Sequence, residues 1–292
     1  MKTNTFILAL IVAIVLFSCN NKQSYKKQLV DQESFTYLGQ KPPGLVPELF
    51  APDIIKNEFR EAEAAFSPDG KEFYFRRRGG KYEKNTLFII KRMDNEWVES
   101  EVPPYAGEPF VSLDGKTLFL GRKYRELTLS GWGELKDTKS LLDDEDRGIM
   151  RLTASVNGTY VFDDYKSDVL RTSTIKNGIR QEPQLLGEQI NAGKWTAHPF
   201  IAPDESFLIW DSERVEGHGD NDLYISFKQD DGSWGNAINL GDKINTEHAE
   251  AYGSISLDGK YFFFHRSYGG DTGDIYWVDA KVILDLKKKL NG

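Results

Sequence analysis

The stretch Ala64-Ala65-Phe66-Ser67-Pro68-Asp69-Gly70-Lys71-Glu72-Phe73-Tyr74-Phe75 decides the fold that this sequence predicts. In it, a Ser-Pro-Asp-Gly turn stands between two apolar runs, and Asp-Gly tolerates the positive φ of a tight hairpin. The turn recurs at steps of 45, 43, 47 and 54 residues, so the chain contains an internal repeat. The further copies are Ser112–Gly115, Ser155–Gly158, the degenerate Ala202–Glu205 and Ser256–Gly259.

A second pair of expected strands follows each turn, as Thr86–Ile89 and a strand near Trp97 follow the first one. Four short strands in about 45 residues is the size of a β-propeller blade. A row of separate hairpins is excluded as the alternative, because an isolated hairpin is barely stable in water. The repeat therefore predicts five blades.

The two ends of the repeat region are expected to meet. The fifth unit lacks a fourth strand after Trp277, and Leu45–Asn57 has the same pattern as the fourth-strand segments Ile179–Asn191 and Trp234–Asn245. Pairing of Leu49 with Tyr276 would complete the last blade and remove an exposed strand edge. We predict an all-β, five-bladed β-propeller over 44–280, closed by an N-terminal strand in the last blade. A short C-terminal helix or tail is expected over 281–292.

The amino terminus has the pattern of a targeting segment. Lys2 precedes the apolar run Phe6–Phe17, which is too short to span a bilayer, so residues 1–18 are predicted to be a signal peptide. Leu16-Phe17-Ser18-Cys19 resembles a bacterial lipoprotein box, in which the cysteine is lipidated. Ordinary secretion with an unmodified cysteine is the alternative. Residues 19–43 are expected to form a flexible tether from lipidated Cys19.

The lipoprotein pattern also implies a location. Asn20 follows the cysteine where an aspartate could retain the protein at an inner membrane. The expected location is therefore the bacterial cell envelope, on an outer-membrane lipid anchor, with the periplasmic or surface side left open.

The Ser-Pro-Asp-Gly turns and the aromatic strands after them resemble the TolB-type, WD-repeat-like propellers of bacterial envelope lipoproteins. The resemblance covers about 44–280 and is densest over His198–Asp204, Asp211–Arg214 and Asp222–Ser226. It implies the fold. Such families include protein-binding scaffolds and, in larger relatives, enzymes that act on acidic sugars, so the resemblance implies no particular activity.

Composition excludes several classes of protein. Aromatic residues make up 13% of the chain, which excludes a disordered chain, and a single cysteine excludes a disulfide-stapled fold. The net charge of −8 argues against a nucleic-acid partner, because phosphate binding requires a basic surface. We expect a monomer that needs no cofactor and whose partner is an envelope protein or a glycan.

Polar residues are predicted to gather at one mouth of the propeller channel. The positions four residues before the turns are all polar: Glu63, Glu108, Arg151, His198 and Tyr252. Positions seven and eight residues after the turn Asp or Asn would surround this ring on the same face. With the ring, they make up the predicted ligand-binding set, which adds Arg76, Arg122, Asp164, Asp211, His265 and Arg266. His218 and His248 map to the same face.

The residue types permit several chemistries. A Glu63/Glu108 pair suits glycosidic cleavage if the carboxyl groups are correctly spaced, and the arginines suit anionic polymers. His198, His248 and His265 are of a metal-ligand type, but no close-spaced ligand motif supports a metal, and none is expected. The candidate catalytic residues are His198, His265, Asp211, Glu63 and Glu108. The same side chains could equally form salt bridges with one another.

Two functions follow from this reasoning. The first is a lipid-anchored propeller that binds a protein, a peptide or an acidic glycan on its channel-mouth face. The alternative is a glycan-cleaving enzyme, a lyase or a hydrolase, that uses the histidines and carboxylates of that face. The sequence contains no recognised catalytic triad, nucleophile elbow or metal motif, so whether the chain is an enzyme stays open.

Overall fold

A computed structural model describes residues 37–291, without 56–57, 95, 105–106 and 143–146. Contacts divide the chain into two units, residues 1–35 and 36–292, and every described residue belongs to the second. The predicted signal peptide, Cys19 and the tether up to residue 36 lie outside the described residues. Within the described part, no helix is long and apolar enough to cross a membrane.

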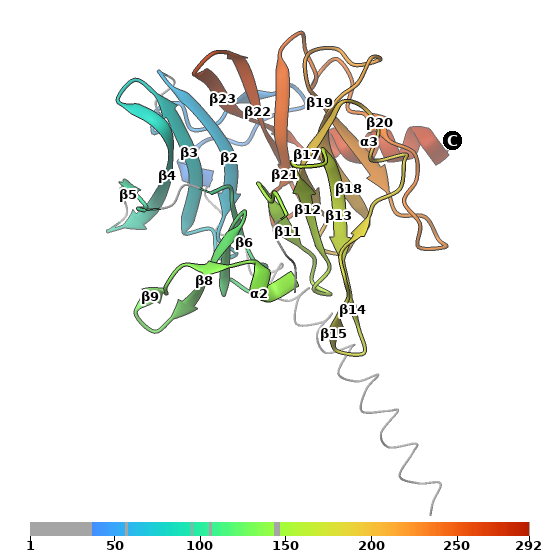
Figure 1. The fold of residues 1–292 in the computed structure, drawn as a ribbon. Helices are drawn as coiled ribbons and strands as arrows, with labels where there is room; N and C mark the ends of the chain where they lie inside the picture. The colour runs from blue at the N-terminus through green and yellow to red at the C-terminus, as the bar shows by residue number, and fades with distance from the viewer. Residues whose placement is uncertain (1–36, 56–57, 95, 105–106, 143–146, 292) are drawn as a thin grey trace, which may run out of the picture. The chain divides into compact units, whose positions relative to one another are not determined.

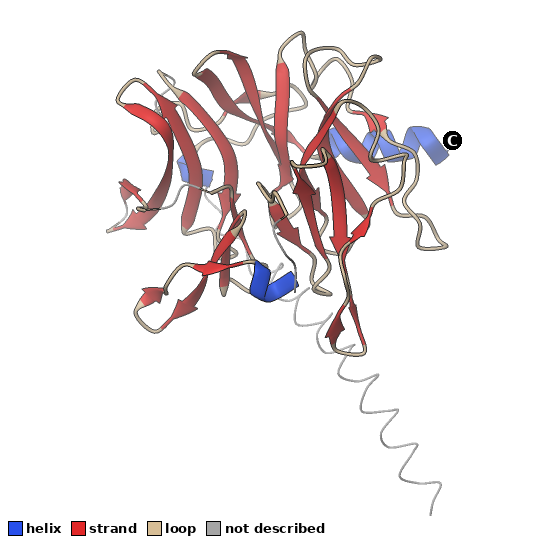
Figure 2. Ribbon diagram, in the orientation of Figure 1, coloured by secondary structure: helices blue, strands red, loops and turns tan. Residues whose placement is uncertain are grey.

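The largest sheet contains both ends of the described chain (Figures 1 and 2). Its strands, in spatial order, are β21 (Ala249–Ile255), β22 (Tyr261–Gly269), β23 (Thr272–Asp279), β2 (Arg60–Phe66), β3 (Glu72–Gly79), β4 (Tyr82–Met93) and β5 (Glu96–Glu101). The short strand β1 (Glu48–Leu49) lies antiparallel to β23, with Leu49 opposite Tyr276, which is the pairing that the sequence predicts. The two halves of the sheet join where β2 and β23 run parallel, at Arg60 and Gly273.

Three further antiparallel sheets follow in chain order, and each pairs strands that lie close together in the sequence. The first contains β6 (Pro109–Val111), β7 (Thr117–Leu120), β8 (Lys123–Thr128) and β10 (Lys136–Asp137), with β9 (Gly131–Trp132) on β8. The second contains β11 (Leu152–Ala154), β12 (Tyr160–Asp164), β13 (Val169–Ser173) and β16 (Gln184–Leu185). The third contains β17 (Trp195–Ile201), β18 (Phe207–Glu213), β19 (Asp222–Phe227) and β20 (Ile238–Asn239).

The remaining elements are small. The strands β14 (Ile175–Lys176) and β15 (Ile179–Arg180) form a separate hairpin (Figure 1). The helical elements are η1 (Tyr37–Gly39), α2 (Lys139–Leu142) and α3 (Lys281–Asn291). The described chain is therefore all-β, with short helical additions.

The repeated turns are built as their sequence predicts. In the first one, the N–H of Gly70 donates to the carbonyl of Ser67, and the Ser67 hydroxyl donates to Asp69 Oδ1 over 2.7 Å. The Ser67 Oγ also accepts a hydrogen bond from the N–H of Glu72. The serine and aspartate side chains therefore stabilise the turn by hydrogen bonds to each other and to its backbone. The turns at Ser112 and Ser256 repeat these contacts.

Aromatic packing holds the two chain ends together. Phe50, directly after β1, is 2% exposed, and its ring centroid lies 5.2 Å from that of Trp277 in β23. The same ring lies 5.2 Å from Phe73 of β3 and 5.1 Å from Phe263 of β22. One buried side chain thus packs against strands from both ends of the chain, which explains why β1 is held although it is only two residues long.

Candidate functional site

Three of the five predicted ring residues occupy β-bulges. The strands β2, β17 and β21 each contain a register shift against the next strand, and Glu63, His198 and Tyr252 lie at these shifts. Their φ angles are 69°, 49° and 59°, in the left-handed region that side-chain-bearing residues rarely adopt. A bulge redirects a side chain, and such strain persists only where the surrounding structure enforces it. The fold therefore turns the same position toward the centre in three strands.

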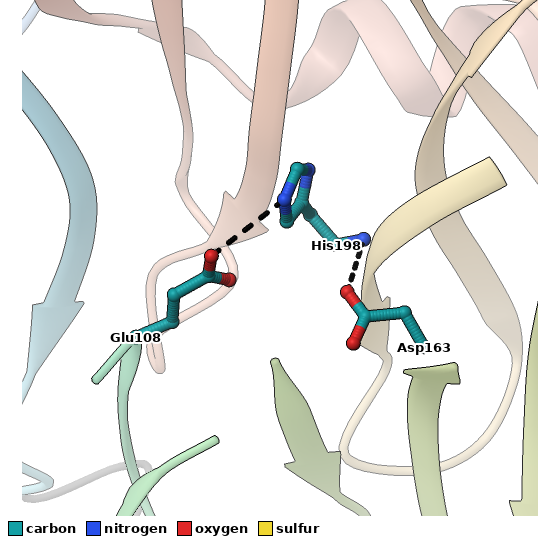
Figure 3. A group of neighbouring side chains, drawn as sticks. All are labelled: Glu108, Asp163 and His198. Atoms are coloured by element: carbon teal, nitrogen blue, oxygen red, sulfur yellow. Dashed lines mark hydrogen bonds and ion pairs between the residues drawn. The ribbon is translucent and has the colours of Figure 1, made fainter. Parts of the chain in front are cut away.

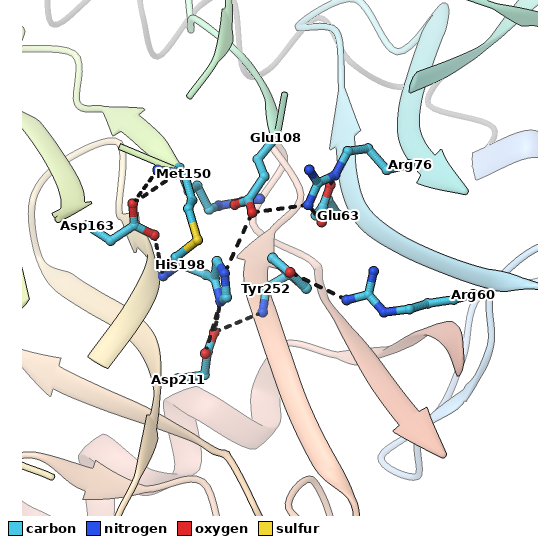
Figure 4. Close-up of polar contacts among 10 residues, drawn as sticks. Arg60, Glu63, Arg76, Glu108, Met150, Asp163, His198, Asp211 and Tyr252 are labelled. Atoms are coloured by element: carbon cyan, nitrogen blue, oxygen red, sulfur yellow. Dashed lines mark hydrogen bonds and ion pairs between the residues drawn. The ribbon is translucent and has the colours of Figure 1, made fainter. Parts of the chain in front are cut away.

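The redirected side chains meet in a buried chain of ion pairs (Figure 4). The Arg76 guanidinium donates to both carboxylate oxygens of Glu63 and, over 3.1 Å, to Glu108 Oε1. The same Glu108 oxygen lies 3.6 Å from His198 Nε2. On the other side of the imidazole ring, His198 Nδ1 lies 2.9 Å from Asp211 Oδ1. We call Glu63, Arg76, Glu108, His198 and Asp211 the central polar network.

Tyr252 joins this network through its backbone and its ring. Its N–H donates to Asp211 Oδ1 over 3.2 Å, and its ring centroid lies 4.1 Å from that of His198. Its hydroxyl accepts a long hydrogen bond from Arg60 Nη2, at 3.4 Å. Four of the five predicted ring residues therefore lie in or against one cluster, and the second-strand residues Arg76 and Asp211 lie there with them.

Asp163 belongs to this cluster and was missed by sequence reasoning. Its Oδ1 accepts the N–H groups of Met150 and Arg151, and its Oδ2 accepts the N–H of His198 (Figure 4). Counting from the turn pointed instead to Asp164. The described part of β11 shows no register shift against β12, and the Asp163 N–H bonds the Arg151 carbonyl, so Asp163 takes the inner position beside Arg151.

Asp164, Arg266 and Arg122 are among the predicted residues that lie outside the network. Asp164 accepts from Gly148 N–H, the Ser167 hydroxyl and Arg171 Nε, so it holds a loop. Arg266 donates to Glu250 and to the Ile244 carbonyl. Arg122 lines a cavity of about 10 Å³ with Asp137 and Arg147.

The histidines separate into two kinds. His198 and His265 are buried, whereas His218 is exposed and His248 packs against Tyr268. His265 Nδ1 donates to the Glu61 carbonyl over 2.8 Å, and burial lowers the pKa of His265 well below its usual value. A Cβ at Gly273 would lie 2.5 Å from His265 Cε1, so glycine is needed there to admit the imidazole ring. His265 is thus a neutral, packed side chain.

Burial and neighbouring charges shift the pKa values of Glu108 and His198, which face each other in the network. Burial raises the pKa of Glu108 to about 7, although the His198 charge opposes it. Burial would lower the pKa of His198, but the Asp211 and Glu108 carboxylates outweigh it and raise that pKa to about 9. At neutral pH the imidazolium is therefore held between two acidic groups. Clustered shifts of this kind are typical of functional sites and also of structural ion-pair networks.

A cation could be held by three of these residues (Figure 3). One potential ligand atom each from Glu108, Asp163 and His198 lies within 4.8 Å of the others. Asp211 at Nδ1 would orient His198 so that Nε2 is the ligand, as in carboxylate–histidine–metal arrangements. His198 would first have to lose a proton, and Arg76 already occupies Glu108 Oε1. The three residues come from three separate sheets, so no short ligand spacing in the sequence could reveal them.

Two cavities in the described part of the chain lie near predicted site residues, and neither is lined by His198, Glu108 or Asp211. The larger, of about 40 Å³, is lined by Arg151 and by apolar residues that include Phe110 and Phe200. The side chains of Glu63 and Asp211 are fully buried, and that of Glu108 is 4% exposed. The central polar network is therefore closed off from a large ligand in this conformation.

No family model matches the chain, and no curated protein matches it. Solved structures similar to it include a thermostable family-43 glycoside hydrolase, with 12% identity over 80% of this chain and 91% of that chain and a TM-score of 0.45. An oligogalacturonate lyase from Vibrio parahaemolyticus has 12% identity over 77% and 67%, with a TM-score of 0.38.

The Cps50 (Swd1) β-propeller domain of Myceliophteria thermophila has 10% identity over 73% of this chain and a TM-score of 0.40. This chain spans 65% of the length of that domain. At such identities and TM-scores, the similarities say nothing about activity. By its own strand pairing, the described chain has an all-β, propeller-like fold.

Proposed function

We propose that this chain is a closed five-bladed propeller that binds a protein, a peptide or an acidic glycan on the face around its central polar network. Support for the ring comes from contacts between the first or second strands of successive groups. β2 contacts β6, β7 contacts β11, β11 contacts β17, β17 contacts β21, and β21 returns to β2. With β1 as the fourth strand beside β21–β23, each of five groups would have four antiparallel strands.

Exposed apolar side chains carry the binding proposal. Tyr165 is 40% exposed, Tyr268 is 41% exposed and Val215 is fully exposed. Each follows the second strand of its group or lies at the end of that strand, so all three lie at the same end of the strands. Tyrosine is enriched among the residues that contribute most of the binding energy at protein interfaces. The network would hold this surface in place, because its charges are already paired with one another.

The test uses the purified full-length chain and two probes, polygalacturonate and solubilised envelope proteins cross-linked to the chain. Replacing Tyr165→Ser and Tyr268→Ser together should weaken binding of at least one probe by tenfold or more. The matched control is Ile179→Ser, which removes an exposed apolar side chain (68% exposed) from the separate β14–β15 hairpin. Equal binding by wild type, the double variant and the control would refute the proposal.

One observation favours the enzyme as a second candidate. Glu108 has a pKa of about 7, and among the described residues its Oε2 has no hydrogen-bond partner. A carboxyl group that is partly protonated at neutral pH is what general acid catalysis needs. Incubation with polygalacturonate should then release shorter oligosaccharides, and Glu108→Gln should abolish their release. No cleavage by the wild-type chain would remove this candidate on that substrate.

The lipid anchor and the outer-membrane location are proposals that rest on Leu16–Cys19 and Asn20 alone. Metabolic labelling with radioactive palmitate should mark the wild-type chain and leave Cys19→Ala unlabelled. Equal labelling of both would exclude lipidation of Cys19.

A further inference from the structure

We propose that Arg151 binds a small monovalent anion, a halide or formate, in a cavity on the turn side of the central channel. This site goes beyond the ligand face proposed above, because it opens toward the opposite ends of the inner strands. The proposal rests on a buried guanidinium group, two of whose nitrogens lack a hydrogen-bond partner among the described residues, and on the cavity that Arg151 lines.

Among the described residues, the Arg151 side chain has no recorded ion-pair partner. The residue is 1% exposed, and neither Nε nor Nη1 has a hydrogen-bond partner among the described residues. The neighbouring Asp163 carboxylate accepts a hydrogen bond from the backbone N–H of Arg151 and not from its side chain. No salt bridge between the Arg151 guanidinium and a carboxylate is found among the described residues. By contrast, Arg76 and Arg77, the other buried arginines, each donate to two glutamates.

The cavity has the walls of a site for one small ion. It measures about 40 Å³, which is room for roughly three water molecules. Arg151 is the only charged residue among the described side chains that line it. The walls of the cavity are mostly apolar. Two serines line it, and the hydroxyl of one of them, Ser254, donates a hydrogen bond to the Ala64 carbonyl.

The position of the lining residues shows from which side an ion would enter. Leu113, Pro203 and Leu257 line the cavity and belong to three of the repeated turns. Arg151 lies at the other end, because it precedes β11 at the level of the central polar network. An ion would therefore pass the turns and meet the guanidinium at the inner end.

Physical chemistry selects the class of ligand. A buried cation without a partner is costly, and a monovalent anion neutralises it while accepting its N–H groups. The planar guanidinium fork suits a carboxylate or a spherical halide. The size of the cavity and its single positive charge argue against sulfate, phosphate or a sugar acid.

The experiment compares anions at constant ionic strength. In crystals of the full-length chain grown with sodium bromide, an anomalous difference peak is expected within about 3.5 Å of the Arg151 nitrogens. In solution, exchanging gluconate for bromide or formate should raise the melting temperature by about 2–4 °C when the small anion is at about five times its dissociation constant. The bromide and formate arms separate a halide site from a carboxylate site.

Two variants complete the test. Arg151→Met should lose the anion-dependent rise, whereas Arg92→Met, the same change at an exposed arginine, should keep it. The crystallographic arm needs only the wild-type chain, so a failure of Arg151→Met to fold leaves the test decisive. No bromide peak at Arg151, or an equal rise in melting temperature for all three proteins, would overturn the proposal.

Discussion

His198 is the residue on which the electrostatics of the centre depends. Its imidazole ring lies between Asp211 at Nδ1 and Glu108 at Nε2, and its backbone N–H is bound by Asp163. The left-handed φ of 49° is what brings both sides of the ring into these contacts. A sequence pattern can place a histidine at this position, but the pairing depends on a bulge that only the folded strand contains.

The raised pKa of His198 makes stability depend on pH. Because this pKa is about 9 in the folded chain and 6.5 ordinarily, the His198 contribution is complete below pH 6.5 and is lost as pH rises through 9. We expect the free energy of unfolding to fall by up to about 3 kcal/mol across this window. Urea unfolding at several pH values measures it.

Two substitutions decide whether His198 is responsible. His198→Asn should flatten the decline in stability between pH 6.5 and pH 9. His218→Asn, at an exposed histidine, should leave the decline unchanged. Parallel curves for wild type and His198→Asn would show that another group causes the pH dependence.

At the scale of elements, the junction of the two chain ends depends on a short strand and one aromatic ring. Phe50 anchors β1 against strands from both halves of the largest sheet. Phe50→Ala should lower the free energy of unfolding by about 3–5 kcal/mol, since it removes a buried ring and leaves a cavity. Leu45→Ala, at a residue that is 48% exposed, should cost less than about 1 kcal/mol.

Chemical denaturation of the two variants measures this difference. Equal small losses would mean that β1 packs loosely and contributes little to the sheet. A large loss for Phe50→Ala, with reduced protection of β23 amides in hydrogen exchange, would show that β1 and β23 are stabilised together.

Local signals in the sequence were enough to predict the hairpins that flank the repeated turns. The contacts of Ser67 and Asp69 are made within five residues, so the turn could be recognised from its letters. The pairing of Leu49 with Tyr276 is distant in sequence, yet it could be predicted because the repeat lacked one strand. The hairpin β14–β15 was not predicted, since the strand expected near Ile179 pairs locally, and β16 takes the outer position instead.

The site was less predictable than the fold. Counting from the turns located Glu63, His198 and Tyr252, because their three strands share the same bulge. It missed Asp163, where the described part of β11 has no such bulge. Burial was also beyond the reach of the sequence: Glu108 and Asp211 are charged residue types that the pattern placed at an open channel mouth.

At the scale of the whole molecule, the proposed ring requires that the two ends of the repeat region share one sheet. If they do, the inner strands surround one centre, and residues from five sequence-distant turns converge there. If they do not, the strands that carry the central polar network are not held around one centre. The proposed ring is supported by contacts of β2 with β6, of β7 with β11, of β11 with β17, of β17 with β21 and of β21 with β2.

A cross-strand disulfide tests the claim most directly. Leu49 and Tyr276 are directly opposite and form a non-hydrogen-bonded pair beside the Phe50–Ile275 hydrogen bond, so their Cα atoms should be about 4.5 Å apart. This separation lies within the range of a disulfide.

In a chain with Cys19→Ala, Leu49→Cys and Tyr276→Cys should oxidise to one intramolecular bond, seen as a mobility shift on a non-reducing gel and as loss of both free thiols. Leu49→Cys with Ile225→Cys, in β19 of another sheet, should stay reduced. Two free thiols in the Leu49/Tyr276 pair under the same oxidising conditions would contradict the account.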